Sequence, residues 1–461
     1  SRPNILKLPL EDKKMISFIT LLLATAAPMN APMNDGSIAA SSATYDGSTL
    51  ILDGDVSLDH GFGNMKAEKA VLTREQETGQ EEFPFTCIEL AEAVRLSLST
   101  EAHVECERAS LDFTTMKGIL TSPKNVHYVD IINSTPFELF SPYLDLQMIK
   151  NALKKDSYDI ERAHAQKGVH LIYDKLYHLK ADSIVFSKDN LRSDGEGPCV
   201  WTFENDRVDA QHFDLDLTQK QLHLQKANGH LTSFSKGDVQ FTADDLNWKH
   251  TENHLVLKGM PKVQETSLGT ITSEQEIDLT LKDQKLHHLK TEGPTELISH
   301  KGHSLKTEGS LEVDSEKSLA TIHSHNSQLL YKEDEMTLMA DEAQIYYKEN
   351  EQGLEPERVE LQGHIKIFSQ EKEGPSRRGI ADTLTYDPAA RTCILKALPG
   401  QKVLFMRDQD QLRISASEVH ITYDPVSKEQ QVRGIGHIVL TLSPEEQNLL
   451  NKVFQNGSPA P

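Results

Sequence analysis

The chain has 461 residues, of which 37% are hydrophobic and 6% aromatic, and its formal net charge is −22. This charge disfavours nucleic acid, because binding to phosphates depends on Lys and Arg, and it also disfavours broad contact with an anionic membrane surface. A compact enzyme of this length usually contains more apolar residues, so an extended β structure with thin walls is expected.

The N-terminal region has the features of a targeting segment. Lys13 and Lys14 precede an apolar run, residues 16–27, and small and polar residues follow it. This order is typical of a secretory signal peptide, and the run is too short to cross a bilayer comfortably as a permanent helix. We therefore expect residues 1–37 to be a signal peptide or N-terminal anchor with a linker, and the protein to be exported. Cleavage and retention of residues 16–27 both stay open.

From residue 38 onward, apolar and polar residues alternate as in half-buried strands. In several runs the apolar residues keep the same parity on both sides of a glycine, as around Gly54, Gly259 and Gly363, so they share one sheet face. The apolar residues that we single out in these runs, and in one later run, are Leu50, Leu52, Val56, Leu58, Leu255, Leu257, Val359, Leu361, Ile365, Ile367, Val419 and Ile421.

A recurring order of short motifs separates these strands. Alanine followed by an acidic or polar residue opens one strand, a polar turn such as Tyr-Asp closes it, and the next strand breaks at a glycine. The openings are Ala67-Glu68, Ala181-Asp182, Ala243-Asp244, Ala340-Asp341, Ala381-Asp382 and Ala416-Ser417. Alanine fits a crowded corner, and glycine within a strand permits a bulge or sharp bend. Since the period is roughly 30 to 45 residues, we expect stacked units that bury one continuous apolar face.

Two regions interrupt the repeat. Residues 131–164 are expected to be a linker with a short helix or a degenerate unit, between β segments at 38–130 and 165–442. Residues 443–461 contain PEEQNLLNKVF at 444–454, which has the N-terminal acids and the apolar spacing of a short amphipathic helix. Capping of the last strand edge is its expected role, in preference to docking of a partner.

The sequence contains no motif for catalysis, for a cofactor or for a metal. Cys87, Cys106, Cys199 and Cys393 lack CxxC spacing, which gives no zinc site, and the 20 histidines form no ligand pattern. A disulfide between Cys87 and Cys106 would require that they lie on neighbouring strands. We expect no catalytic residue, no metal and no cofactor.

The stretch YDGSTLILDGDVSLDHGFGNMKAEKAVL resembles the OstA-type repeat of periplasmic lipopolysaccharide-transport proteins, the family of LptA, LptC and the N-terminal domain of LptD. Gly54-Asp55-Val56 stands where the family has Gly-Asn-Val, and Ala67-Glu68 stands where it has Ala-Asp. Gly363-His364-Ile365 and Gly436-His437-Ile438 are looser versions of the glycine motif. The resemblance covers most of residues 38–442 and is best at 39–75, 336–387 and 410–442.

This resemblance implies an all-β fold: an elongated open antiparallel β-jellyroll, in which a folded-over sheet forms a solenoid-like stack of repeats around an apolar groove. It implies a periplasmic component of a bridge that carries lipopolysaccharide toward the outer membrane. Proteins of the family, or copies of this chain, would join it by edge-to-edge strand pairing. Acyl chains would lie in the groove, so the apolar residues singled out above are candidate lipid contacts as well as candidate core residues.

Two other classes of function stay open. One is a structural or adhesive β-repeat protein outside the cytoplasm. The other is an extracytoplasmic β-solenoid enzyme that acts on polysaccharides, which would need clustered carboxylates facing a groove. The acidic residues here are spread along the chain, and Trp201 and Trp248 are the only tryptophans for sugar stacking. We therefore expect a protein that is not an enzyme, and the sequence does not separate an LptA-like from an LptC-like role.

Overall fold

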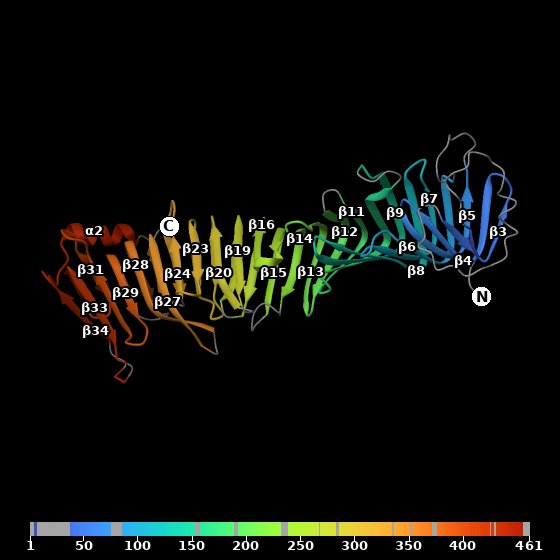
Figure 1. The fold of residues 1–461 in the computed structure, drawn as a ribbon. Helices are drawn as coiled ribbons and strands as arrows, with labels where there is room; N and C mark the ends of the chain where they lie inside the picture. The colour runs from blue at the N-terminus through green and yellow to red at the C-terminus, as the bar shows by residue number, and fades with distance from the viewer. Residues whose placement is uncertain are drawn as a thin grey trace. The chain divides into compact units, whose positions relative to one another are not determined.

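The computed structural model describes residues 4–6, 37–74, 85–152, 157–188, 192–231, 238–266, 268–282, 285–333, 336–350, 353–370, 376–424, 426–427 and 430–454. The chain divides into two compact units, residues 1–224 and 225–461 (Figure 1). The predicted targeting run at residues 16–27 lies outside the described residues. Within the described part of the chain, no helix is both long and apolar enough to cross a membrane.

Unit 1 is an antiparallel meander. From β4 to β13, each strand pairs with the next strand along the chain. Its strands are β1 (Asn4–Leu6), β2 (Ile38–Ala40), β3 (Ser42–Tyr45), β4 (Thr49–His60), β5 (Gly63–Thr73), β6 (Cys87–Ser97), β7 (His103–Asp112), β8 (Lys117–Ile132), β9 (Thr135–Lys150), β10 (Tyr158–Tyr173), β11 (Tyr177–Ser187), β12 (Arg192–Phe203) and β13 (Asp206–Asp216). The next strand, β14 (Gln221–Leu231), contains the boundary between the units.

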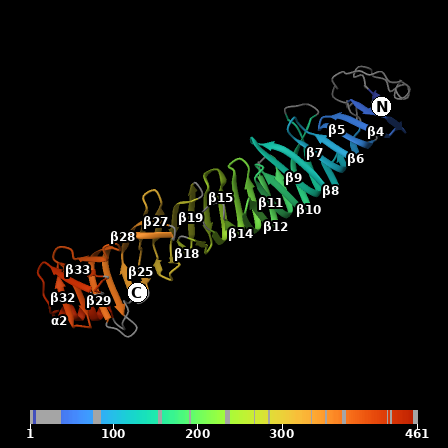
Figure 2. The same ribbon diagram turned by 90° about the horizontal axis from the view of Figure 1, so that it is seen from below.

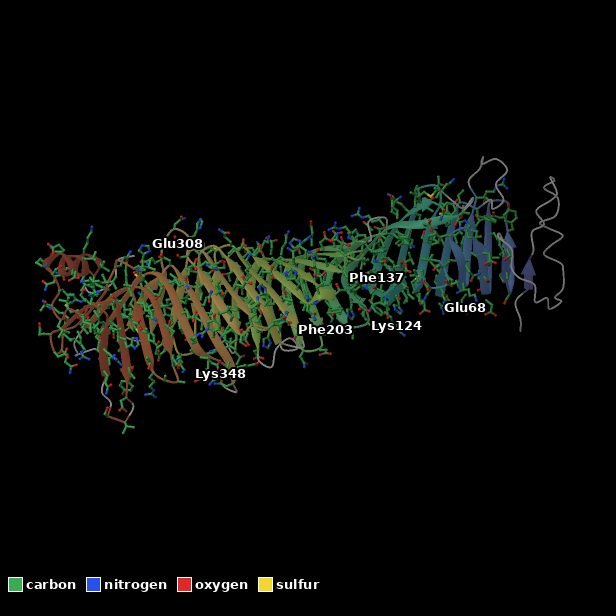
Figure 3. The ribbon with its side chains drawn as sticks, turned by 60° about the vertical axis from the view of Figure 1, so that its left-hand side comes forward. Glu68, Lys124, Phe137, Phe203, Glu308 and Lys348 are labelled. Atoms are coloured by element: carbon green, nitrogen blue, oxygen red, sulfur yellow. The ribbon has the colours of Figure 1, made fainter. Side chains whose placement is uncertain are left out.

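The pairings from β4 to β13 all shift register near the middle of the strands. The shift falls between Asp53 and Val56 in β4, and between Ala181 and Val185 in β11. Such bulges bend a strand, so each strand has two halves that meet at a corner. Glu68 and Lys124 lie at this corner and are seen along the same margin of unit 1 in Figure 3.

The folded-over halves of unit 1 have free ends that form two rows, which we call its lips. The first lip consists of the turns at residues 61–62, 98–102, 133–134, 174–176 and 204–205. The second lip consists of the opposite strand ends at residues 73 and 87, 150 and 158, and 187 and 192, with the turns at 113–116 and 217–220. The backbone N–H of Tyr158 on the second lip donates to the carbonyl of Gly61 on the first, at 2.9 Å. The two halves therefore face each other.

Most strands of unit 2 are shorter, and its described residues also form one α-helix and one 3-10 helix. Its elements are β15 (Val239–Lys249), the 3-10 helix η1 (His250–Glu252), β16 (His254–Lys258), β17 (Lys262–Glu265), β18 (Gly269–Ser273), β19 (Glu276–Lys282), β20 (Lys285–Glu292), β21 (Thr295–Ile298), β22 (Ser304–Thr307), β23 (Ser310–Asp314), β24 (Leu319–His323), β25 (Leu329–Glu333), β26 (Met336–Ala340), β27 (Glu342–Asn350), β28 (Gly353–Gln370), β29 (Ser376–Asp387), β30 (Thr392–Lys396), β31 (Val403–Arg407), β32 (Leu412–Ala416), β33 (Glu418–Tyr423), β34 (Gln430–Ile435) and α2 (Pro444–Val453).

The strands of unit 2 form two antiparallel ladders, seen from below in Figure 2. Sheet A runs in the order β15, β16, β19, β20, β23, β24, β27, β28, β29, β30, β33 and β34. Sheet B runs in the order β15, β17, β18, β21, β22, β25, β26, β28, β29, β31 and β32. The long strands β15, β28 and β29 take part in both ladders, because one end of each pairs in sheet A and the other end in sheet B.

The recurring alanine motifs lie where the chain passes between the two halves of the fold. In β15, Ala243-Asp244 separates residues that pair with β17 from residues that pair with β16. Ala340 ends β26 in sheet B, and β27 in sheet A begins at Glu342. In unit 1, Ala67-Glu68 coincides with the register shift of β5. The recurring alanine motifs therefore mark the corner of the folded sheet.

The glycines of these motifs fit against the acidic residue of a neighbouring corner. Gly259 and Gly363 have φ angles of +75° and +79°, a region that side chains other than glycine rarely adopt. A Cβ atom on Gly259 would lie 2.5 Å from Cβ of Asp244, and one on Gly363 would collide with Asp341. Both the backbone angle and the space therefore require glycine at these corners.

Helix α2 confirms the short C-terminal helix expected from the sequence, and it has a full capping box. The Ser443 hydroxyl accepts from the backbone N–H of Glu446 at 3.2 Å, and the Glu446 carboxylate accepts from the backbone of Ser443 at 2.8 Å. The helix packs on Phe368 of β28 and Leu404 of β31, which lie in sheet B, and Figure 1 shows it beside these strands. The helix therefore covers a sheet face, whereas its sequence favoured a role in capping the last strand edge.

Two other expectations differ from the structure. The short helix considered within residues 131–164 is wrong, because β9 and β10 fill most of this region and pair with each other. Neither Cys87 nor Cys106 forms a disulfide in the structure, and in the pairing of β6 with β7, Cys87 lies opposite Asp112 while Cys106 lies opposite Val94. Strand register therefore separates the two thiols. The all-β antiparallel jellyroll itself is confirmed.

Candidate functional site

The apolar residues singled out from the sequence lie on the inward side of the folded sheets. Leu52 and Leu58 of β4 are fully buried, as is Leu257 of β16. Only Val359, Ile367 and Ile421 among them are half-buried, and the others are buried. Neighbouring strands extend these rows with further apolar residues: Leu255 lies opposite Leu279 in the register of sheet A. These apolar residues are distributed over both units, so they do not form one compact cluster.

Unit 2 contains a small apolar cavity of about 30 Å³. Its lining residues come from both sheets and are Leu231, Val239, Phe241, Leu255, Val263, Glu265, Leu268, Ile271, Leu279, Leu281, Leu286 and Leu289. Leu268 lies in the turn after β17, and Leu281 and Leu286 lie on the two sides of the turn between β19 and β20. The cavity is therefore at the free turns of the two sheets, on the side away from the corner.

Of the apolar residues singled out above as candidate lipid contacts, Leu255 alone lines this cavity. Val239 and Phe241, and likewise Leu279 and Leu281, follow the same alternation of apolar residues and were within reach of that signal. Leu268 lies in a turn, where no periodicity indicates which side chains are directed inward. The single carboxylate of the lining, Glu265, accepts a hydrogen bond from the backbone N–H of Leu268 at 2.8 Å, so it holds the turn at the cavity.

The size of this cavity decides what the cavity can hold in this conformation. About 10–15 Å³ of such space is needed for one water molecule, so 30 Å³ is far too little for an acyl chain. The turns of sheets A and B must move apart before a long apolar ligand can enter. During such a movement the two sheets stay connected at the corner, whose glycines have positive φ angles.

The outward face of sheet A is polar. His254 pairs with Asp278 at 2.8 Å, and Lys258 with Glu276 at 2.9 Å. These pairs join neighbouring strands and are partly exposed to solvent, where each adds little stability. The fold thus combines an apolar interior with a solvated charged exterior.

The described part of the chain has His, Cys, Asp and Glu side chains, the residue types required by a metal site and, for cysteine, by a reactive thiol. It contains no group of three or more His, Cys, Asp or Glu side chains that could hold a metal ion. Burial raises the pKa of Cys106 and Cys393 to about 12 and that of Cys199 to about 11. These thiols are therefore protonated near neutral pH and are poor nucleophiles.

Comparison with known proteins finds similarity in unit 2. Residues 310–401, about a fifth of the chain, match the family described as "LptA/(LptD N-terminal domain) LPS transport protein". Among solved structures, one match is LptH, the LptA-homologous periplasmic component of the lipopolysaccharide transport device from Pseudomonas aeruginosa. It is 10% identical, and the match covers 31% of this chain and 95% of LptH with a TM-score of 0.24. No curated protein sequence matches the chain. The segment from β23 to the residues before β31 is thus similar in sequence to the LptA/LptD N-terminal family.

Proposed function

We propose that this protein is a periplasmic component of lipopolysaccharide transport that holds acyl chains between its two facing sheets. The observation that supports it most directly is the apolar interior of unit 2, which reaches the free turns at Leu268 and Leu286. The family similarity of residues 310–401 supports the same class of ligand. The chain acts as a carrier and not as an enzyme.

The energetics suit a carrier. Burial of an acyl chain contributes about 0.8 kcal/mol per methylene, so a chain of about twelve carbons gains roughly 10 kcal/mol before ordering costs. Separating the two rows of turns offsets part of this gain, because it exposes leucines such as Leu281 and Leu289, which are now buried. The remaining affinity is moderate, which permits transfer to the next protein.

The free edges of the sheets are the proposed contacts with partners. Among the described strands, β34 pairs only with β33, and β3 pairs only with β4. Unpaired strand edges accept a further strand. We propose that second copies of this chain, or other jellyroll proteins of the transport system, add to these edges. Light scattering over a range of concentrations tests self-association, which should increase with concentration.

Lipid binding is tested with purified lipopolysaccharide and a fluorescent fatty acid as the displaced probe. Leu268→Asp and Leu286→Asp place a charge at the free turns and should weaken binding at least about tenfold, because an ionised carboxylate in an apolar site is costly. Leu398→Asp is the matched control, since Leu398 is 54% exposed and lies outside the cavity lining. Unchanged binding in the two cavity variants, or no binding by the wild type, would contradict the proposal.

A further inference from the structure

The two lips of unit 1 are joined by a cluster of four rings, which we call the clasp: His60, Phe62, Phe113 and Tyr158. His60 and Phe62 belong to the first lip, and Phe113 and Tyr158 to the second. The ring centroids of His60 and Phe113 are 4.2 Å apart, and those of Phe113 and Tyr158 are 4.9 Å apart. Phe62 meets Phe113 edge to face at 6.2 Å. Phe113 therefore lies at the centre of the contact.

Hydrogen bonds reinforce the clasp. The carbonyl oxygen of Gly61 accepts from the backbone N–H of Tyr158 at 2.9 Å and from the hydroxyl of Ser157 at 3.1 Å. These bonds join residues that are more than 90 positions apart in the sequence. Phe62 is 3% exposed and Phe113 is 7% exposed, so the rings fill the space between the lips.

A second bridge crosses the lips elsewhere in unit 1. The side-chain amide of Asn133, in the turn after β8, donates to the carbonyl of Leu217 at 3.3 Å. At the free turns of unit 2 lies the apolar cavity, whose lining is mostly leucine. The free ends of the two units thus differ in the residues that the structure places there.

We propose that the clasp is a gate on the interior of unit 1, and that an acyl chain enters there only after the four rings separate. The proposal rests on the proposed lipid-binding function and adds that the two units load differently. Aromatic pairs add only modest stability beyond the apolar area that they bury, and the donors and acceptor of the hydrogen bonds regain water partners when the lips separate. The clasp can therefore open reversibly while the corner keeps the halves connected.

The test uses the full chain and a dodecanoic acid that carries a diazirine, with the labelled peptides mapped by mass spectrometry. Phe113→Ala and Tyr158→Ala open the clasp. Phe140→Ala is the matched control, because Phe140 also stacks on a histidine, His127, at 4.3 Å, but lies outside the clasp. A locked form carries both Gly61→Cys and Ser157→Cys, so that oxidation joins the two lips by a disulfide. Its labelling is compared before and after reduction of the same protein, so a difference in folding between variants does not affect this comparison.

We expect the wild type to be labelled mainly in unit 2. The clasp-opening variants should show about tenfold more label in β4 to β8, because losing one aromatic pair shifts the closed–open equilibrium by roughly that factor. The oxidised locked form should lose label from unit 1 and keep it in unit 2, and reduction should restore it. Phe140→Ala should match the wild type.

Two results would overturn the proposal, and they are distinguishable. If unit 1 is labelled equally in the wild type, the opened variants and the oxidised locked form, while unit 2 is labelled, the clasp does not gate and the lipid-binding function stands. If neither unit is labelled in any form, or if lipopolysaccharide does not compete with the probe, the lipid-binding function fails and the gate with it.

Discussion

The imidazole Nδ1 of His364 lies 2.7 Å from the carboxylate Oδ2 of Asp341, across the corner that connects sheets A and B. The backbone N–H of Asp341 donates to the carbonyl of Gly363 at 3.1 Å, and the amide of Gln328 donates to Oδ1 of Asp341 at 3.2 Å. The corner is thus an ordered network around one acidic residue. This explains why the Ala-acid pair and the glycine recur together in the sequence.

Substitution of the corner glycine should destabilise the fold. Gly363→Ala places a Cβ atom against Asp341 at a φ angle of +79°, which should cost about 2 to 3 kcal/mol, from backbone strain and overpacking together. Gly302→Ala is the matched control, because its φ is +82° and nothing lies within 4 Å of the added atom. That control should cost only about 1 kcal/mol. Urea unfolding measures the free energy of unfolding of both variants. An equal loss in the two would contradict the role of the Asp341 contact.

The stability of unit 1 should depend on pH through His60. Burial lowers the pKa of His60 from 6.5 to about 4, so the folded state favours the neutral ring. Between pH 6.5 and 4 the unfolded chain binds a proton that the folded chain does not, and stability falls as the pH falls through this window. The loss is up to about 3 kcal/mol. Unfolding experiments from pH 7 to pH 4 should show it, and His60→Phe should remove most of this slope.

The buried thiols should resist modification. Because burial raises the pKa of Cys106 and Cys393 to about 12 and that of Cys199 to about 11, thiolate is scarce at pH 8. A thiol reagent such as dithionitrobenzoate should modify these cysteines slowly in the folded protein and rapidly in urea. Fast modification of Cys106 in the folded state would show that β6 and β7 open locally.

The cavity of unit 2 should make its lining sensitive to truncation. Leu289→Ala removes a side chain that is 1% exposed, and should cost about 2 to 4 kcal/mol. Leu398→Ala, at a position that is 54% exposed, should cost less than about 0.5 kcal/mol. Thermal unfolding measures the difference, and similar midpoints for the two variants would indicate that the sheets are not packed together at this point.

Removal of the N-terminal cap of helix α2 should have a smaller effect on stability. Ser443→Ala removes the acceptor for the backbone N–H of Glu446, and should cost about 1 kcal/mol. Ser415, whose hydroxyl donates to Glu446 at 2.8 Å, links the helix to β32, so the loss should be felt in unit 2 as a whole. Hydrogen exchange of α2 and β32 measures it, and faster exchange in α2 alone would show that the link is weak.

The alternation of apolar and polar residues and the motifs at the corner predicted much of the fold, because both reflect what the local backbone requires. The parity of Leu50, Leu52, Val56 and Leu58 around Gly54 correctly indicated one buried face. The split of β15 between two partners was not predictable, since pairing depends on strands that lie further along the chain. The interruption in the repeat at 131–164 suggested a linker with a short helix or a degenerate unit. The segment forms β9 and the start of β10, with the same inward alternation as the other strands.

The candidate site was predicted less completely than the fold. Residues on strands, such as Leu255, were within reach of the pattern, whereas Leu268, Phe62 and Phe113 lie in turns. Whether a side chain in a turn is directed inward depends on the opposite lip, which is far away in sequence. The contact of Gly61 with Tyr158 is of this kind.

Strands that pair in register lie close together in the sequence. This has a consequence for how such proteins change in evolution. In unit 2 a strand of sheet A pairs with the next strand along the chain or with the third, as β19 does with β20 and β20 with β23. A duplication or loss of one whole repeat would leave every remaining partner and every inward face in place. A single-residue insertion within a strand would instead reverse the side chains beyond it. The pairing scheme therefore tolerates a change of whole repeats better than the insertion of one residue within a strand.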